Sequence, residues 1–453
     1  MLKKQFLLIA LFPVMGMTSC EKFLDEKPDI KLVVPKSLDD ADLLLNDYST
    51  MNDNYPLYGE LGNDDYFLTK ELWEAASDID QRNAYVWADV PYEDVSQWRN
   101  PYKTVYNANQ VLEILAKNTA YNKDKRFQRI SGEAHFFRAF AFQFLIEIYC
   151  VAYQAGTAAD EYGIPLRLDP AIDEPSSRAS LKDSYDQVIQ DYKTAATSLP
   201  DQNEFVGRPF KASAYAGLSR AYIAMGDYAQ AYAYADSCML LYAGLLDFNT
   251  LDPSNSLPIP RFNREVLFPA VSKYTGIMNA EYCFVDTVLY RTYAADDWRK
   301  TVLFEASNEL EGAFHFKGNF DNATGNLFVG LTTSEVFLNK AESAVRIGKV
   351  SEALSAMNQL LKTRWKTEAF SDWTETDPER LLMMIVAERR KELVFRGRRW
   401  ADLKRLNLES RFQKKLVRKL GDKEHQLEPN SPKYAYRLSE IVINLSGIPQ
   451  NKR

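Results

Sequence analysis

The chain has 453 residues, a formal net charge of −7 at pH 7 and an aromatic content of 13%. This acidic balance argues against nucleic-acid binding, which usually needs a clustered basic face. The four cysteines are widely and irregularly spaced, which excludes a disulfide framework and a zinc site built on paired cysteines.

The first twenty residues read as an export signal. Lys3 and Lys4 precede an apolar run over 5–15, and small residues then lead to Cys20. The run is too short for a transmembrane helix of about 20 residues, and its basic start is typical of a secretory signal. The sequence TSC at 18–20 fits the cleavage motif of bacterial lipoproteins, although Met17 stands where leucine is usual. We predict a signal peptide at 1–19 and a palmitate-bearing lipid anchor on Cys20, with ordinary secretion as the alternative.

Apolar residues at helical spacing predict an all-α body, because no segment alternates apolar and polar residues for long. Asp377 and Pro378 suit the cap and first turn of the last helix. Cys150 and Cys238 fall in apolar helical surroundings, where we expect buried thiols. The helices are expected at 98–117, 127–153, 184–199, 211–225, 228–241, 332–347, 351–364 and 378–395.

Two of the predicted helix pairs align with each other as repeats. When Gly226 and Gly348 are taken as the same turn residue, Ser219 coincides with Ala341, and Ala231 coincides with Ala353. A tetratricopeptide repeat needs small residues at these positions, since its two antiparallel helices approach most closely there. We predict a tetratricopeptide-like scaffold. The helices at 98–117, 127–153 and 184–199 would act as degenerate repeats on which the pairs stack.

Three long segments, at 47–94, 246–280 and 282–327, lack a helical period. We call 47–94 the first excursion and 282–327 the second excursion. Loops of this length are usually functional or disordered. Their aromatic content favours order and therefore a function.

Several segments together resemble the SusD/RagB family of outer-membrane lipoproteins. The sequence SGEAHFFRAF at 131–140 resembles the family's GEAxFLRAF helix, and GIPL at 163–166 resembles its GxVPL turn. KASAYAGLSRAYIAMGD at 211–227 resembles the segment around its repeat helix. VAERRKELVFRGRRWADLKRL at 386–406 resembles the specific ERxxELxFEGxRWxDLxR stretch, with Arg396 where an acidic residue is common. GIPQN at 447–451 is similar to the terminal PIPxxE segment, and FLD at 23–25, shortly after Cys20, is also typical.

The resemblance implies a helical body with tetratricopeptide pairs and a ligand site on the loop excursions. Family members face the cell exterior on the outer membrane. Each caps a TonB-dependent (SusC-like) transporter barrel and captures a ligand for import, mostly an oligosaccharide and in some members a peptide. We therefore expect an N-terminal SusD-like helical region at 20–245 and a C-terminal SusD/RagB region at 246–453, packed as one body.

The aromatic side chains of the two excursions are the predicted ligand contacts. Sugar rings stack their apolar C–H faces on Trp and Tyr, while nearby polar side chains hydrogen-bond the hydroxyls. The alternative for any single ring is that it pins a long loop to the body. The predicted contacts are Trp73, Arg82, Asn83, Tyr85, Trp87, Tyr290, Tyr293, Asp296 and Trp298.

The charged run at 388–405 has two interpretations. Opposite charges three and four residues apart favour a structural ion-pair network, and the alternative is a site for an anionic ligand. The carboxylate doublets at 64–65 and 296–297 have two further roles to weigh, as calcium ligands or as the acid pair of a surface hydrolase. Neither doublet fits the spaced Asp-x-Asp loop of calcium sites, and the three histidines have no metal-ligand spacing. We expect no cofactor, no metal and no enzymatic activity.

The function predicted from the sequence is capture of a glycan, or a peptide, at the cell surface and its transfer to a TonB-dependent transporter. The alternative is a tetratricopeptide interaction scaffold without a ligand of its own.

Overall fold

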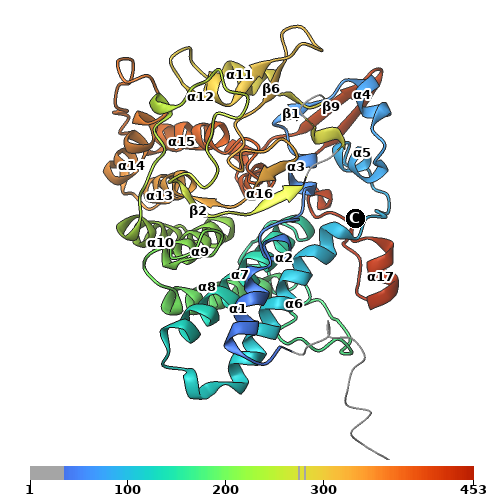
Figure 1. Ribbon diagram of the computed structural model, residues 1–453. Helices are drawn as coiled ribbons and strands as arrows, with labels where there is room; N and C mark the ends of the chain where they lie inside the picture. Colours follow the sequence, from blue (N-terminus) through green and yellow to red (C-terminus); the bar gives the residue numbers. More distant parts are fainter. Residues whose placement is uncertain (1–34, 274–275, 280–281) are drawn as a thin grey trace, which may run out of the picture. The chain divides into compact units, whose positions relative to one another are not determined.

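The computed structural model describes residues 35–273, 276–279 and 282–453, so the predicted signal peptide and Cys20 lie outside the described residues. Helices dominate the fold (Figure 1), which confirms the all-α prediction. None of the helices in these ranges is long and apolar enough to cross a membrane.

The first half of the chain contains α1 (Leu38–Asn46), α2 (Tyr48–Met51), α3 (Tyr58–Gly62), α4 (Lys70–Ala75), α5 (Ile79–Tyr85), α6 (Ser96–Lys117), α7 (Lys125–Tyr149), α8 (Leu181–Ser198), α9 (Lys211–Met225) and α10 (Tyr228–Leu241). The second half contains α11 (Thr287–Arg291), α12 (Arg299–Val302), α13 (Thr333–Arg346), α14 (Val350–Lys362), α15 (Pro378–Glu392), α16 (Arg399–Leu406) and α17 (Glu440–Ser446).

The strands are β1 (Tyr66–Phe67), β2 (Val266–Phe268), β3 (Val271–Lys273), β4 (Phe284–Val285), β5 (Phe304–Ala306), β6 (Phe314–Phe316), β7 (Asn326–Phe328), β8 (Leu331–Thr332), β9 (Leu416–Leu420) and β10 (Lys423–Leu427). They form antiparallel two-stranded sheets, which pair β1 with β4, β2 with β8, β3 with β7, β5 with β6 and β9 with β10.

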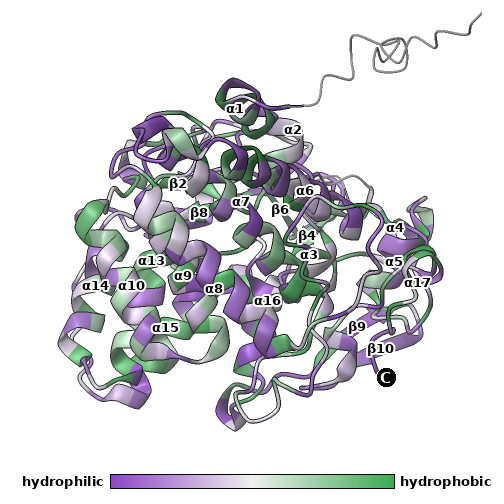
Figure 2. Ribbon diagram, turned by 90° about the horizontal axis from the view of Figure 1, so that it is seen from below, coloured by the Kyte–Doolittle hydropathy of each residue, from purple (hydrophilic) through white to green (hydrophobic). Residues whose placement is uncertain are grey.

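Seven helices, α6, α7, α8, α9, α10, α13 and α14, form a continuous row in which each contacts the next. We call these the helix row. The view from below shows α8, α9, α10 and α14 following one another, with hydrophilic and hydrophobic residues alternating along them (Figure 2). The first three helices of the row supply the neighbours that the sequence predicted for the repeat pairs.

Most predicted helices are found within a few residues of their expected ends, and α9 and α10 have the predicted bounds. Two predictions ran too long. Helix α7 stops at Tyr149 because Cys150 is extended, with φ −119° and ψ 159°. Helix α15 stops at Glu392, and Phe395, which the prediction included, adopts a left-handed φ of 54°.

The turns of the two repeat pairs depend on glycine. Gly226 and Gly348 adopt φ values of 76° and 80°, which strain any residue with a Cβ atom. Ser219 Oγ donates to the carbonyl oxygen of Ala231 at 3.1 Å, so the facing helices are in close contact. Ser219, Ala231, Ala341 and Ala353 are all fully buried. This is the packing that a tetratricopeptide pair requires, and the assignment to that repeat stays a prediction.

Helix α7 is the centre of the larger core and is buried on almost every face of its second half. Phe136, Phe137 and Phe140 contact Phe268 of β2 edge to face, with ring centroids 4.7, 5.5 and 4.9 Å away. Full burial of one such ring stabilises the fold by about 1.5–3 kcal/mol. The contact ties the helix row to the chain that leads into the C-terminal half.

The excursions are more regular than the sequence predicted. The first excursion contains α2 to α5, and the second contains α11, α12 and several strands. In Figure 1, α4 and α5 (blue) lie at the upper right and α11, α12 and β6 at the top, while α6, α7 and α8 occupy the lower half. The residues from 37 to 453 form one unit by their contacts, and α10 packs on α13 across the expected boundary at 245.

Candidate ligand-binding site

A short antiparallel sheet joins the two excursions. Tyr66 and Phe67 of β1 pair with Val285 and Phe284 of β4, and the rings of Phe67 and Phe284 lie 5.5 Å apart. Ile277, from the segment at 246–280, donates its backbone N–H to Gln81 Oε1 of the first excursion at 3.2 Å. Two segments that are about two hundred residues apart in the sequence are therefore held together by this sheet.

In the first excursion, Trp73 and Arg82 hold each other in place across α4 and α5. The indole Nε1 of Trp73 donates to the Arg82 carbonyl oxygen at 3.0 Å. The Arg82 guanidinium lies 5.7 Å from the centre of the Trp73 ring and donates to the Glu74 carbonyl oxygen at 3.2 Å. Trp73, Arg82 and Asn83 are each partly exposed. The structure thus places these three predicted contacts together at the surface, with the indole fixed.

The next two predicted contacts, Tyr85 and Trp87, are buried, with 1% and 3% of their surface exposed. Tyr85 Oη accepts a hydrogen bond from the Leu68 N–H at 2.8 Å, and Trp87 Nε1 donates to the Gly62 carbonyl oxygen at 2.8 Å. The guanidinium of Arg418, from β9, lies 3.5 Å from the Tyr85 ring centre and 5.0 Å from that of Trp87. Their rings offer no face to a ligand in this structure. Both rings instead attach the first excursion to the β9–β10 hairpin, which is the structural alternative stated for each predicted contact.

In the second excursion, too, one predicted contact is partly exposed and another is buried. Tyr290 is partly exposed and stacks on Phe314, with ring centroids 3.6 Å apart and an interplanar angle of 18°. Lys300 Nζ lies 5.3 Å from the Tyr290 ring centre. Tyr293 is only 1% exposed and donates its hydroxyl proton to the Lys391 carbonyl oxygen at 2.8 Å. Tyr290 can meet a ligand, whereas Tyr293 anchors the excursion to α15.

Trp298 is the counterpart of Trp73 in the second excursion. It is partly exposed, and its Nε1 donates to Asn249 Oδ1 at 2.8 Å. Lys366 Nζ lies 5.7 Å from the centre of its ring and 2.9 Å from Asp296 Oδ1. Each excursion therefore presents one indole whose N–H is fixed by the protein and whose ring has a cation beside it.

A buried ion network fixes the backbone next to Trp298. Arg299 pairs with Asp297 at 2.7 Å, with Glu392 at 3.1 Å and with Glu388, and its side chain is fully buried. Arg364 pairs with the same Glu392 at 2.7 Å. Since losing one partner of a buried pair leaves an uncompensated charge, these contacts hold the loop at one position over α15.

The charged run at 388–405 also forms buried ion pairs, which confirms its interpretation as a structural network. Its arginines pair with buried carboxylates: Arg389 with Asp402 of the same run at 2.8 Å, and, elsewhere in the chain, Arg398 with Glu147 at 2.6 Å and Arg405 with Glu342 at 2.6 Å.

The two carboxylate doublets are held by cations. Asp64 pairs with Arg399 at 2.6 Å and Asp65 with Arg390 at 2.8 Å. Burial raises the pKa of Asp64, but the charges of Arg399 and Arg390 outweigh it and hold the pKa well below its usual range. In the other doublet, Asp297 is part of the Arg299 network and Asp296 faces Lys366. Across the described ranges, no group of three His, Cys, Asp or Glu side chains could hold a metal ion.

Two family models match most of the chain. A SusD-like model described as "Starch-binding associating with outer membrane" matches residues 22–223, and a model described as "SusD family" matches residues 323–451. The chain belongs to the SusD family.

Curated relatives and solved structures agree with the assignment. SusD-like protein P2 of Formosa agariphila is 24% identical over 375 residues, which cover 69% of this chain and 71% of that protein. SusD-like protein P25 of the same organism is 24% identical over 164 residues, which cover 33% of this chain and 31% of that protein, so the chain spans less than a third of that relative.

Two solved structures share the fold of this SusD-family chain. A SusD superfamily protein from Bacteroides thetaiotaomicron has a TM-score of 0.74 at 23% identity, covering 92% of this chain and all of that one. A SusD-like carbohydrate binding protein from Bacteroides vulgatus has a TM-score of 0.66 at 18% identity, covering 90% and 96%.

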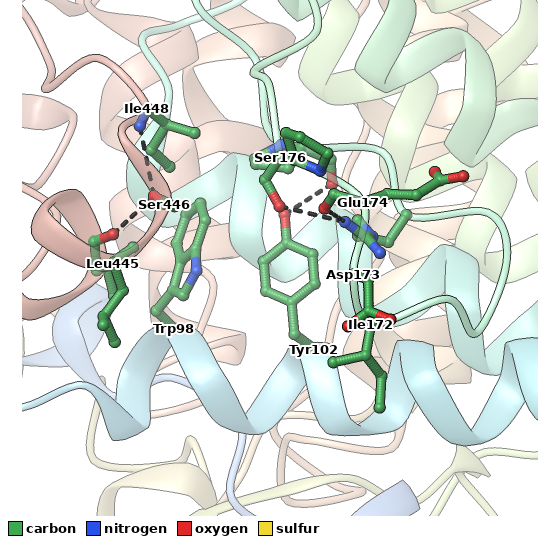
Figure 3. A pocket seen from close by; sticks show the side chains of 13 residues that line it. Trp98, Tyr102, Ile172, Asp173, Glu174, Ser176, Leu445, Ser446 and Ile448 are labelled. Carbon is green, nitrogen blue, oxygen red and sulfur yellow. Dashed lines mark hydrogen bonds between the residues drawn. The ribbon is translucent and has the colours of Figure 1, made fainter.

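This SusD-family protein also has a cavity that the sequence did not predict. Its volume is about 560 Å³, and it lies between α6, the segment at 165–176 and α17. Trp98 and Tyr102 of α6 form part of its wall (Figure 3). None of the predicted contacts lines it. The sequence gives no signal for it because three segments that are far apart in the chain meet there.

Proposed function

We propose that this protein captures a glycan at the cell surface and transfers it to a TonB-dependent transporter in the outer membrane. The glycan would bind to the partly exposed residues of the two excursions, which we call the excursion face: Trp73, Arg82, Asn83, Tyr290, Asp296 and Trp298.

The observation that carries the proposal is the pair of fixed indoles, Trp73 and Trp298, on two excursions joined by β1 and β4. A ring that is already held in its bound orientation loses little conformational freedom when a ligand stacks on it. Arg82, Asn83 and Asp296 supply donors and acceptors beside the rings. A small-molecule site generally consists of apolar surface with a few polar groups that direct the ligand.

The chemical class of the ligand is supported by the comparisons. One matching family model is described as starch-binding, and a solved structure with the same fold is that of a SusD-like carbohydrate binding protein. Starch fragments are therefore the first glycans to test, and peptides are the second class.

A glycan array that includes maltoheptaose, probed with the full chain and its variants, tests the site. We expect Trp73→Ala and Trp298→Ala each to weaken binding about tenfold or more, which corresponds to about 1.4 kcal/mol. Trp373→Ala is the matched control because Trp373 is also partly exposed but packs against the cluster formed by α13, α14 and α15, where its backbone bonds to the Asn358 side chain of α14. Unchanged binding in both excursion variants would move the site elsewhere.

Transfer to a transporter is supported by the lipoprotein motif at Cys20 and by the description of the matching family, whose members associate with the outer membrane. Affinity purification of the native lipoprotein from outer membranes should recover a TonB-dependent transporter in constant proportion. Recovery without any transporter barrel would contradict this part of the proposal.

The helix row supports a second candidate function, an interaction scaffold without a ligand of its own, because stacked helix pairs form extended binding surfaces. That function predicts no binding to any glycan or peptide on the panel and no growth defect on any polymer when the gene is deleted.

A further inference from the structure

The cavity beside α6 has an aromatic floor and two apolar walls. Trp98 and Tyr102 rise from α6 with their ring centroids 5.0 Å apart. Leu445 of α17 stands beside Trp98, and Ile172 stands on the far side of Tyr102 (Figure 3). Leu445 is 85% exposed and Ile172 is 79% exposed. Together with the two rings they line one cavity, and exposed apolar side chains gathered in this way, unlike ones scattered singly, mark an interaction site.

The polar groups of the cavity are mostly engaged with the protein itself. Tyr102 Oη donates to the Pro165 carbonyl oxygen at 2.8 Å. Arg167 donates to the carbonyl oxygens of Glu174 and Ala171 and to Ser176 Oγ. Ser446 Oγ, in turn, donates to the Val442 carbonyl oxygen at 2.6 Å.

A sugar needs several unengaged donors and acceptors pointing into its site. With Tyr102, Arg167 and Ser446 already bonded, this cavity suits an apolar side chain better than a carbohydrate.

The carboxylates of Asp173 and Glu174 are the exception, since neither has a hydrogen bond or ion pair with another described residue. Both are exposed and line the cavity, where Arg167 is the single cation among the lining residues. The rim therefore carries more negative than positive charge, and it favours a positive charge on whatever binds.

We infer that this cavity docks a segment of a partner protein in which an apolar side chain lies next to Lys or Arg. The apolar side chain inserts between Leu445 and Ile172 onto Trp98 and Tyr102, and the basic side chain pairs with Asp173 or Glu174. This inference does not depend on the glycan proposed for the excursion face.

Selection from a random heptapeptide library displayed on phage, with the full chain immobilised, tests the inference. We expect enrichment of peptides with an apolar residue within two positions of Lys or Arg. The double variant Asp173→Lys/Glu174→Lys should select acidic-apolar peptides instead, and it should bind the best wild-type peptide at least about tenfold more weakly at low salt. Ile172→Asp/Leu445→Asp should no longer select the basic-apolar peptides, because the apolar walls are lost.

The matched control is Glu368→Lys/Asp372→Lys, which makes the same charge change at exposed residues between α14 and α15. Far-ultraviolet circular dichroism and thermal unfolding verify that each variant folds. No enrichment above the uncoated surface, or no basic preference, overturns the inference. The inference is also overturned if Glu368→Lys/Asp372→Lys changes the selected peptides from basic to acidic in the same way. If Ile172→Asp/Leu445→Asp abolishes glycan binding and leaves peptide selection unchanged, the cavity belongs to a carbohydrate and the inference is wrong.

Discussion

Replacing Arg364 with Met tests the buried ion network that lies beside the second excursion. The Arg364 side chain is fully buried, with its guanidinium 2.7 Å from both Glu265 and Glu392. Glu392 keeps a second cation in Arg299 at 3.1 Å. Glu265 loses the only cation it pairs with in the described part of the chain, and it keeps a single hydrogen bond, from the Leu246 N–H at 2.9 Å.

The expected cost follows from that stranded carboxylate. Removing one partner of a buried ion pair destabilises a protein by about 3–5 kcal/mol, whereas removing both partners is often close to neutral. Arg364→Met should therefore lower the free energy of unfolding by this amount. The double variant Arg364→Met/Glu265→Gln should recover at least half of the loss, because no unpaired charge then remains.

Urea unfolding followed by tryptophan fluorescence measures both variants against the wild type, since a change in midpoint at constant slope reports stability. If Arg364→Met costs less than about 1 kcal/mol, or if Glu265→Gln restores nothing, the stranded-carboxylate reasoning is refuted.

Three further predictions use the same unfolding measurement. Burial raises the pKa of Glu60 from 4.5 to about 7. The stabilisation from its protonated form is present below about pH 4.5 and is lost as the pH rises through about 7. Relative to the wild type, Glu60→Gln should gain up to about 3 kcal/mol between about pH 4.5 and pH 8, and a difference that does not vary with pH would contradict this. Gly226→Ala should lower stability by about 1–2 kcal/mol because Gly226 has a left-handed backbone. Gly156→Ala is the control, since there is open space around the added atom, and it should change stability by less than about 0.5 kcal/mol. Equal costs for the two variants would argue against backbone strain. Arg398→Met should cost about 3–5 kcal/mol because it breaks a buried ion pair. Arg396→Met breaks no ion pair among the described residues and should cost about 1 kcal/mol. Because the two arginines are about equally buried, equal costs would show that burial alone sets them.

The helices could be predicted from the sequence because their signals are local. Apolar spacing and the left-handed turn residue Gly226 fixed the ends of α9 and α10. The end of α7 was missed because Cys150 ends the helix without a glycine or proline.

Burial of the excursion rings could not be predicted. Trp73 and Trp87 occur in the same kind of local sequence, and the buried one is covered by Arg418, more than three hundred residues later. The structural role of the charged run at 388–405 could be predicted from its alternating positive and negative residues. Its partners were not, since Glu147 and Glu342 belong to helices α7 and α13.

The most direct test of ligand binding by the excursion face is hydrogen–deuterium exchange of the full chain with and without the best-binding glycan from the array. Our proposal predicts slower exchange on binding in two segments at once, 70–83 and 287–300, and no change in the helix row. Protection confined to the cavity segments 165–176 and 440–448, or to the helix row, would contradict it.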